Sequence, residues 1–213
     1  LGLPEYKKAQ LAYEIEREDL NLSGGKQDQY AAIFGGFNLI EFKQDGSTIV
    51  NTLRLEKQLV NELECSLLLY YGGRSRSSAK IINEQIKNTQ NKNKKTSEAM
   101  HRIKESAYRM KDAVLTGSFP SFAEMLSAAW QEKKKTSSVV SNRELERTID
   151  YALANGAKAV KVSGAGGGGM VMIYCEPIDR QKLIDALKQL SGTTYPVKFS
   201  KNGVESWIVE DRA

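Results

Sequence analysis

The apolar positions of the chain follow two spacings, which together predict a mixture of helices and strands. Apolar residues three and four positions apart predict helices. Helices are expected after Pro4, at about 27–34, at 100–114, around 122–130, at 141–154 and at 179–190. The first is expected to end between Asn21 and Gly25. Ser141 and Glu144 have the spacing of a capping box at the start of the fifth.

Short apolar runs bounded by turn residues predict strands. They lie at 37–42, 47–53, 65–71, 158–163, 169–175, 195–199 and 204–209. Asp45-Gly46 is a hairpin signal between the first two runs. The run from Cys65 to Tyr71 is apolar apart from Ser66, so we expect a central strand buried on both faces. The order of the elements predicts an α+β fold with mixed strand pairing.

The composition is that of a folded protein without a membrane span. Of the 213 residues, 40% are hydrophobic and 27% are charged, which allows a packed core. No apolar run approaches the ~20 residues that cross a bilayer, and no secretory signal opens the sequence. Cys65 and Cys175 lie in apolar runs and are expected to be buried free thiols, which predicts a cytoplasmic protein. With two cysteines and the single His101, a Cys/His zinc site is excluded.

The net charge of +5 favours anionic partners only weakly. Lysines concentrate at 87–95 and at 133–135, in both places without interleaved aromatic residues. We interpret the first group as part of a mobile polar loop over 87–97, and the second as a solvated helix C-terminus. No nucleic-acid partner is predicted.

A glycine cluster between two predicted strands is the most unusual segment of the chain. Glycine permits positive φ and a close approach to the backbone, and consecutive turn amides can form an anion site. The segment is therefore either a tight strand connection or a phosphate site. Its residues are Ser163, Gly164, Ala165, Gly166, Gly167, Gly168 and Gly169, which hold five of the 17 glycines.

Two known glycine motifs do not fit this segment. Gly164-x-Gly166-x-x-Gly169 matches the dinucleotide fingerprint letter by letter, but that fingerprint requires a helix directly after the loop. The residues that follow, 170–175, predict a strand instead. A P-loop is excluded because no Lys-Ser or Lys-Thr closes the run. A strand, a glycine turn and a second strand remain.

A second candidate segment is Gly24-Gly25-Lys26-Gln27-Asp28-Gln29-Tyr30, at the start of a predicted helix. Asp28 has two interpretations. It can be a helix N-terminal acid that the helix dipole stabilises. It can also be a carboxylate that orients a substrate hydroxyl and accepts its proton, with Lys26 neutralising a transferring phosphoryl group.

A third candidate segment, residues 72–78, follows the predicted central strand and contains Arg74, Arg76 and three serines. It fits a capped helix with surface arginines. It also fits a site for a substrate phosphate or carboxylate, since helix N-termini and arginines both bind anions.

Taken together, these segments resemble the GHMP sugar and isoprenoid kinase superfamily. Its third motif is a strand, a Gly-Ala-Gly-rich turn and a strand, as at 163–174. The segment 24–30 is similar to the D-glycero-D-manno-heptose 7-phosphate kinase branch, as are residues 31–38, Ser75-Arg76-Ser77, and Trp130 before a lysine cluster. The similarity covers essentially the whole chain.

The resemblance implies a role for each matching residue. Asp28 would position or deprotonate an anomeric hydroxyl, and Lys26 would stabilise charge near the sugar or the transferred group. Gly25 and Arg76 would bind substrate, with Arg76 as a clamp for the sugar phosphate. Ser163 to Gly168 would pack against the nucleotide phosphates. ATP and Mg²⁺ are implied as cofactors, with the metal ligands expected outside this sequence.

One departure from the superfamily bears on activity. Its amino-terminal substrate motif and its Pro-x-x-x-Gly-Leu-x-Ser-Ser-Ser phosphate loop do not occur in this sequence. The resemblance therefore begins just after that loop, and this stretch alone is not expected to be a competent kinase. It implies that residues 1–62 end an N-terminal catalytic domain and that 63–213 form a ferredoxin-like C-terminal α/β sandwich.

The implied function is ATP-dependent phosphorylation of the anomeric hydroxyl of D-glycero-D-manno-heptose 7-phosphate. A sugar phosphate and ATP are thus the expected partners, without nucleic acid or membrane, and a homodimer is one assembly compatible with the family. Two alternatives stay open. The first is a kinase for fucose or another free sugar, and the second is a non-catalytic ligand-binding α+β module.

Overall fold

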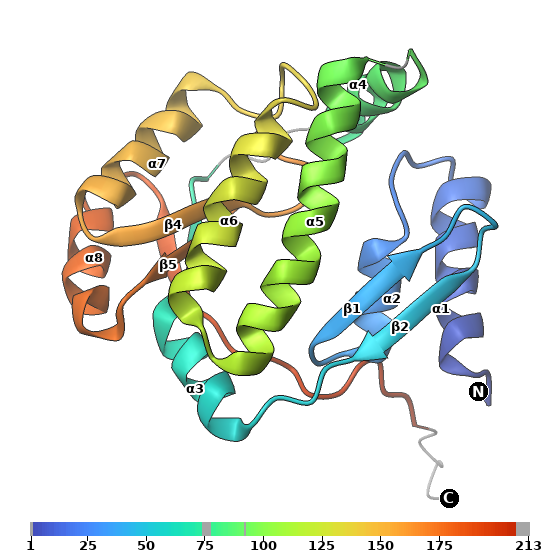
Figure 1. The fold of residues 1–213 in the computed structure, drawn as a ribbon, viewed down its shortest axis with the longest axis horizontal. Helices are drawn as coiled ribbons and strands as arrows, with labels where there is room; N and C mark the ends of the chain where they lie inside the picture. Colours follow the sequence, from blue (N-terminus) through green and yellow to red (C-terminus); the bar gives the residue numbers. More distant parts are fainter. Residues whose placement is uncertain (1, 74–77, 92, 208–213) are drawn as a thin grey trace, which may run out of the picture. The chain divides into compact units, whose positions relative to one another are not determined.

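The computed structural model describes residues 2–73, 78–91 and 93–207 (Figure 1). The chain forms two compact units, of which the first combines Leu1–Arg54 with Phe199–Ala213 and the second is Leu55–Lys198. The predicted domain boundary between 62 and 63 falls inside a helix of the second unit, α3 (Lys57–Ser66). None of the described helices is long and apolar enough to cross a membrane.

The first unit contains helices and one hairpin. α1 (Glu5–Glu14) continues into a π-helical turn, η1 (Ile15–Asp19), and α2 (Gln27–Phe34) follows. β1 (Asn38–Phe42) and β2 (Thr48–Thr52) pair antiparallel. Asp45 Oδ1 accepts hydrogen bonds from the backbone N–H and the hydroxyl of Ser47, at 2.9 and 2.6 Å, which fixes the turn. The predicted hairpin is confirmed.

Aromatic rings pack the inside of the first unit. The buried Tyr30 of α2 lies edge-on to Tyr6 of α1 and to Phe42 of β1, with ring centroids 6.3 and 5.8 Å apart. The C-terminal segment joins this unit: the N–H of Gly36 donates to the carbonyl of Ser200 at 2.9 Å. Such aromatic contacts add stability beyond the area they bury, so α2 is held firmly on α1 and the hairpin.

The second unit is built on a four-stranded antiparallel sheet in the order β4-β5-β3-β6. Its strands are β3 (Leu67–Tyr71), β4 (Ala157–Val162), β5 (Met170–Cys175) and β6 (Thr193–Pro196). This is the ferredoxin-like order, in which the first and third strands of the unit lie at the centre. The predicted α+β, ferredoxin-like fold is confirmed. The predicted mixed pairing is wrong, because every strand pair in the described residues is antiparallel.

Helices cover this sheet, and α5 and α6 lie side by side (Figure 1). After α3, the helices of the unit are α4 (Ser78–Gln90), α5 (Lys94–Thr116), α6 (Phe119–Lys134), α7 (Arg143–Ala154), the 3₁₀ turn η2 (Pro177–Asp179) and α8 (Arg180–Leu187).

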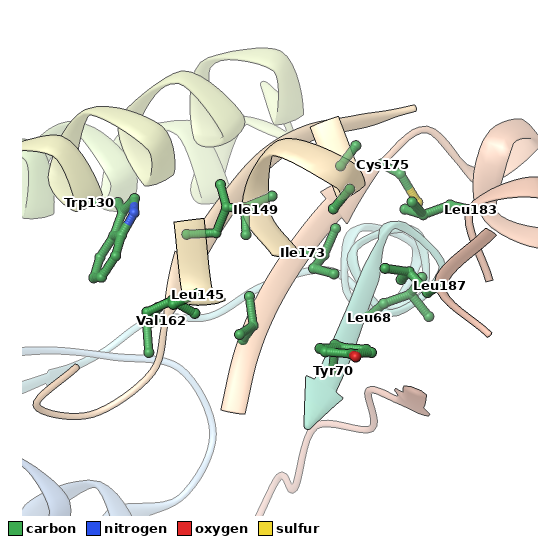
Figure 2. Packing of buried hydrophobic residues seen from close by; sticks show 14 of the residues in the cluster. Leu68, Tyr70, Trp130, Leu145, Ile149, Val162, Ile173, Cys175, Leu183 and Leu187 are labelled. Atoms are coloured by element: carbon green, nitrogen blue, oxygen red, sulfur yellow. The ribbon is translucent and has the colours of Figure 1, made fainter. Parts of the chain in front are cut away.

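Alternate residues of the central strands face two different helix layers. Figure 2 shows Ile173 of β5 among side chains of α7 and α8, including Ile149, Leu183 and Leu187. Its neighbour Tyr174 faces the opposite side, where its ring lies 6.0 Å from that of Phe122 on α6. A sheet buried on both faces gives β4 and β5 rigid positions, and the turn that joins them inherits that support.

Several predicted boundaries are wrong, and the contacts explain the largest shift. Residues 65 and 66 end α3 rather than beginning a strand. Cys65 is exposed, so the prediction that it is buried is wrong, whereas Cys175 is buried as predicted. Arg180 Nη1 donates to the carbonyls of Glu64, Cys65 and Leu67, at 3.3, 2.7 and 2.7 Å. Carbonyls at a helix C-terminus need such partners, so a side chain more than a hundred positions away lets α3 continue through Ser66.

Within the polar segment 87–97, residues 87–90 and 94–97 are helical rather than part of a loop. α4 runs to Gln90, and α5 begins at Lys94 with the side chain of Asn93 accepting from the N–H of Thr96; residue 92 lies outside the described residues. The two closing strands also differ from the prediction. β6 occupies Thr193–Pro196 instead of 195–199, and the described part of 204–209 contains no strand.

Candidate functional site

The glycine turn, residues 163–169, joins the antiparallel strands β4 and β5. The N–H of Ser163 donates to the carbonyl of Met170 at 2.8 Å, which closes the base of the turn. The strand–turn–strand prediction is confirmed, and no helix follows the turn. The structure therefore brings together Ser163, Gly164, Ala165, Gly166, Gly167 and Gly168 in one short connection.

Glycine is required at two positions in the middle of this turn. Gly166 has a φ of 110°, and a Cβ there would lie 2.8 Å from the carbonyl oxygen of Val140. Gly167 has a φ of 75°, and its Cβ would lie 2.6 Å from Cδ1 of Ile81. Side chains are unfavourable at such φ values. At Gly166 the backbone of Val140 leaves no space for a Cβ, and at Gly167 the positive φ and the contact with Ile81 make a side chain unfavourable.

Two side chains from other parts of the second unit donate hydrogen bonds to carbonyl groups of the glycine turn. The Lys133 ammonium at the end of α6 donates to the carbonyl of Gly164, and Asn142 Nδ2 donates to the carbonyl of Gly167 at 3.1 Å. The N–H of Gly167 donates to Val140 at 2.6 Å. Anchoring the carbonyls in this way fixes which face each peptide group presents, and oriented peptide N–H groups are what an anion site needs.

A cavity of about 330 Å³ opens beside the turn. Such a volume lies at the small end of the range for ligand pockets. Its wall combines Gly167–Gly169 with Asn142, Arg147 and Thr148 of the α7 region and Tyr70 of β3. The hydroxyl of Tyr70 accepts from the N–H of Gly192 at 2.9 Å, and burial raises the pKa of Tyr70 above its usual value. The phenol therefore stays neutral at physiological pH and lines the cavity as a polar, uncharged group.

The segment with Lys26 and Asp28 lies in the first unit, at the start of α2. Lys26 is the N-cap residue, and Asp28 is exposed in the first turn. A negative charge at this place interacts favourably with the helix dipole, and a carboxylate there can accept a hydrogen bond from a hydroxyl. Gly25 is exposed, with open space where a Cβ would point.

Contacts around this segment fix two of its side chains. The Lys26 ammonium lies 4.8 Å from the ring centroid of Tyr13 on α1, a cation–π contact. Gln29 is buried, and its Nε2 donates to Glu16 Oε2 at 2.7 Å. Arg76, the predicted clamp for a sugar phosphate, lies outside the described residues, so its role stays a prediction.

No group of three or more His, Cys, Asp or Glu side chains that could hold a metal ion occurs in the described parts of the chain. A magnesium ion bound to ATP usually takes its ligands from the phosphates, water and one or two carboxylates.

The part of the chain that contains the glycine turn matches a known protein family. Residues 93–191 match the family model "GHMP kinases C terminal". This stretch, a little under half of the chain, is therefore similar to the C-terminal part of GHMP kinases. The match includes α5, α6, α7, both strands of the turn and the turn itself.

Relatives of known name extend this similarity to the whole chain. A D-glycero-alpha-D-manno-heptose 7-phosphate kinase from Campylobacter jejuni is 44% identical over 209 residues, which are 98% of this chain and 61% of the relative. A crystal structure of a D-glycero-D-manno-heptose 1-phosphate kinase from Bacteriodes thetaiotaomicron superposes with a TM-score of 0.78 at 38% identity, covering 99% of this chain and 57% of that one. An L-fucokinase/L-fucose-1-P guanylyltransferase from Bacteroides fragilis is 28% identical over 74% of this chain and 17% of its own length. The chain thus spans about three-fifths of the heptose kinases that it matches.

Two residues that anchor the glycine turn from outside were not predicted from the sequence. Lys133 was interpreted as part of a solvated helix end, yet its ammonium binds the carbonyl of Gly164, 31 positions away. Asn142, not Ser141, caps α7, and its Oδ1 accepts from the N–H groups of Glu144 and Leu145. The hydroxyl of Ser141 donates to Glu146 instead. A Ser-Asn pair before an apolar helix signals a cap, but only the fold shows which residue provides it.

Proposed function

We propose that this chain is part of an ATP-dependent sugar kinase, and that its acceptor is the anomeric hydroxyl of a heptose 7-phosphate. The observation that carries the proposal is 44% identity over 98% of the chain with a heptose 7-phosphate kinase. The geometry agrees with it. Phosphoryl transfer needs positioning and charge neutralisation more than covalent chemistry, and the chain offers a rigid turn, an ionisable carboxylate and fixed lysines.

The glycine turn is the proposed contact for the nucleotide phosphates. Space beside the turn supports this: apart from the glycine and its two chain neighbours, no heavy atom lies within 4 Å of the place where a Cβ would stand at Gly164 or at Gly169. Lys133 and Asn142 bind the carbonyl oxygens of Gly164 and Gly167. These oxygens are therefore kept from turning toward a bound anion, which they would repel. Ser163 to Gly168 would thus contact ATP, with N–H groups supplied by residues of the turn other than Ser163 and Gly167, whose own N–H groups bond to Met170 and Val140. We assign no ligand of Mg²⁺ within this chain.

Asp28 is the proposed base, or orienting group, for the sugar hydroxyl. It is exposed and lies in the first turn of α2. An ionised carboxylate within hydrogen-bond reach of a hydroxyl can take its proton as the phosphoryl group arrives. The Lys26 ammonium, held over Tyr13, would stabilise charge near the transferred group. Gly25 would let the sugar approach the backbone closely.

Kinetics with a sugar panel test the proposal. The complete gene product is incubated with ATP, Mg²⁺ and heptose 7-phosphate, fucose or galactose, and ADP formation is measured by a coupled assay. We expect turnover with the heptose phosphate, and Asp28→Asn should lower kcat by roughly 10²-fold or more, in line with a lost general base. Asp19→Asn, at another exposed aspartate of the same unit, should retain activity. Full turnover by Asp28→Asn would exclude the assigned base, and no turnover with any sugar would favour a ligand-binding module.

A kinase for a free sugar is the alternative, because a fucokinase is also among the relatives, at 28% identity. A free sugar carries no phosphate to clamp. The Arg76→Ala variant distinguishes the two hypotheses. Selective loss of affinity for the phosphorylated sugar supports the heptose acceptor, and an unchanged KM for that sugar argues against it.

We also propose a cytoplasmic location. Cys65 and Cys175 are free thiols, as is usual in a reducing compartment. An ATP-dependent kinase also needs a compartment that supplies ATP, and the cytoplasm does so.

A further inference from the structure

A π-helical turn lies between α1 and the segment that carries Lys26 and Asp28. Residues Ile15–Asp19 form this turn, in which the N–H of Leu20 donates to the carbonyl of Ile15 at 2.9 Å. Asn21 follows with a φ of 52°, in the left-handed region. π-helical turns are rare and occur often at functional sites. Here the turn places Glu16 and Arg17 beside the loop of residues 22–25.

The guanidinium of Arg17 binds three carbonyls of that loop. Nε donates to Gly25 at 3.3 Å, and Nη1 donates to Leu22 and Ser23 at 3.2 and 3.3 Å. The side chain is only 15% exposed. A planar group with five N–H donors can gather several acceptors at once, which a lysine ammonium cannot do in the same geometry. Arg17 thus determines the path of the chain over 22–25.

Gly24 allows this contact. A Cβ at Gly24 would lie 2.3 Å from Cζ of Arg17 and 2.4 Å from its Nη2. Because the guanidinium is the free end of a long side chain, an added methyl group would displace it rather than the backbone. Any residue other than glycine would therefore cost the loop its three side-chain bonds.

Glu16 connects the same arginine to α2. Its Oε2 lies 3.2 Å from Arg17 Nη2 and accepts from Gln29 Nε2 at 2.7 Å. Gln29 is 5% exposed and follows Asp28 directly in the first turn of α2. The loop that enters α2 and the first turn of α2 are thus both tied to neighbouring residues of one π-helical turn.

We propose that Arg17 is a positioning residue of the kinase site: it holds loop 22–25 so that Lys26 and Asp28 keep the geometry required for phosphoryl transfer. This inference rests on the proposed function. Misplacing a reacting group by about 1 Å can cost 10²-fold in rate. Arg17 binds the loop and not the substrate, so it acts on the turnover rate through Asp28.

The test is a mutational cycle in the complete gene product, with Arg17→Lys, Gly24→Ala and the double variant. Each single variant should lower kcat with the heptose phosphate by roughly 10- to 100-fold, while KM for ATP changes less than about twofold. The double variant should be no slower than either single variant, because both remove the same contact. Arg54→Lys, at an exposed arginine of the same unit, is the matched control and should retain kcat. An unchanged kcat in Arg17→Lys, or losses that add in the double variant, would overturn the proposal.

A second readout does not depend on activity. The initial rate of tryptic cleavage after Lys26, followed by mass spectrometry, should rise at least several-fold in Arg17→Lys and Gly24→Ala and stay unchanged in Arg54→Lys, because a loosened segment opens more often. If the parent protein shows no kinase activity, the proposed function fails, and a raised cleavage rate still establishes that Arg17 orders the loop. If the parent is an active kinase and the variants match it in both readouts, the role of Arg17 is refuted.

Discussion

Lys161 shows how one residue can work against the stability of the strand that carries it. It lies in β4 between Val160 and Val162, which are buried in the core of the second unit. Burial lowers the pKa of the Lys161 ammonium below its usual value. No ion pair to this ammonium occurs among the residues that the structure describes. Burying a charge costs free energy unless a partner compensates.

We therefore expect Lys161→Met to stabilise the protein at neutral pH. The gain should be on the order of 1 kcal/mol, or about 2 to 4 °C in Tm for a chain of this size. With a folded-state pKa below the unfolded value, the unfolded chain binds more protons, so the parent becomes more stable as pH rises between the two values. The advantage of the variant should shrink accordingly toward pH 10.5, the ordinary lysine value. Thermal unfolding at several pH values measures this. Lys158→Met, at an exposed position of β4, is the control, and a gain independent of pH would contradict the explanation.

At the scale of elements, Asn142 links the start of α7 to the glycine turn. Its Oδ1 caps the helix by accepting from Glu144 and Leu145, while its Nδ2 donates to the buried Gly167. The Oδ1 atom of Asn142 thus caps α7, and its Nδ2 atom holds the glycine turn. Substitutions at this position can remove either both of these functions or only the second.

Asn142→Ala removes both functions and should lower the free energy of unfolding by about 1 to 2 kcal/mol, as for a lost N-cap. Asn142→Asp keeps an acceptor for the cap and adds a charge that the helix dipole favours, so it should cost less. It lacks the donor to Gly167, however, and it sets a carboxylate against that carbonyl. We expect faster amide hydrogen exchange at residues 164–169 in both variants. Urea unfolding should give a larger loss of unfolding free energy for Asn142→Ala than for Asn142→Asp. Equal destabilisation by both, with an unchanged turn, would show that Asn142 does not hold Gly167.

The elements that could be predicted from the sequence are those whose cause lies within a few residues. Asp45-Gly46 defines its hairpin locally, and the glycine cluster between two apolar runs defines a strand–turn–strand unit. The contacts that shape the site span longer separations. Lys133 reaches Gly164 across 31 positions, and Arg180 reaches Cys65 across 115. Spacing along a chain carries no signal for such pairs, so α3 and the turn anchors follow only from the tertiary fold.

At the scale of the whole molecule, the rigidity of the proposed phosphate turn depends on the sheet beneath it. β4 and β5 enter and leave the turn, and Ile173 of β5 is fully buried within the main hydrophobic cluster (Figure 2). A truncation at Ile173 removes packing from the layer that α7 and α8 form. The effect should therefore reach the turn although no atom of Ile173 belongs to it.

Ile173→Ala should lower the free energy of unfolding by about 2 to 5 kcal/mol, and Ile173→Val by about 0.5 to 1.5, because lost burial is added to the cost of a cavity. Ile178→Ala is the matched control: Ile178 is 91% exposed in the same unit, and its truncation should stay within about 0.5 kcal/mol. Denaturant unfolding gives these values, and hydrogen exchange locates them. The largest loss of protection should fall within Leu55–Lys198, including the amides around the turn. If Ile173→Ala lowers global stability while exchange at 163–169 stays that of the parent, the turn derives its order from local anchors such as Lys133, Asn142 and Val140, and the sheet is not what preorganises it for the proposed phosphate contact.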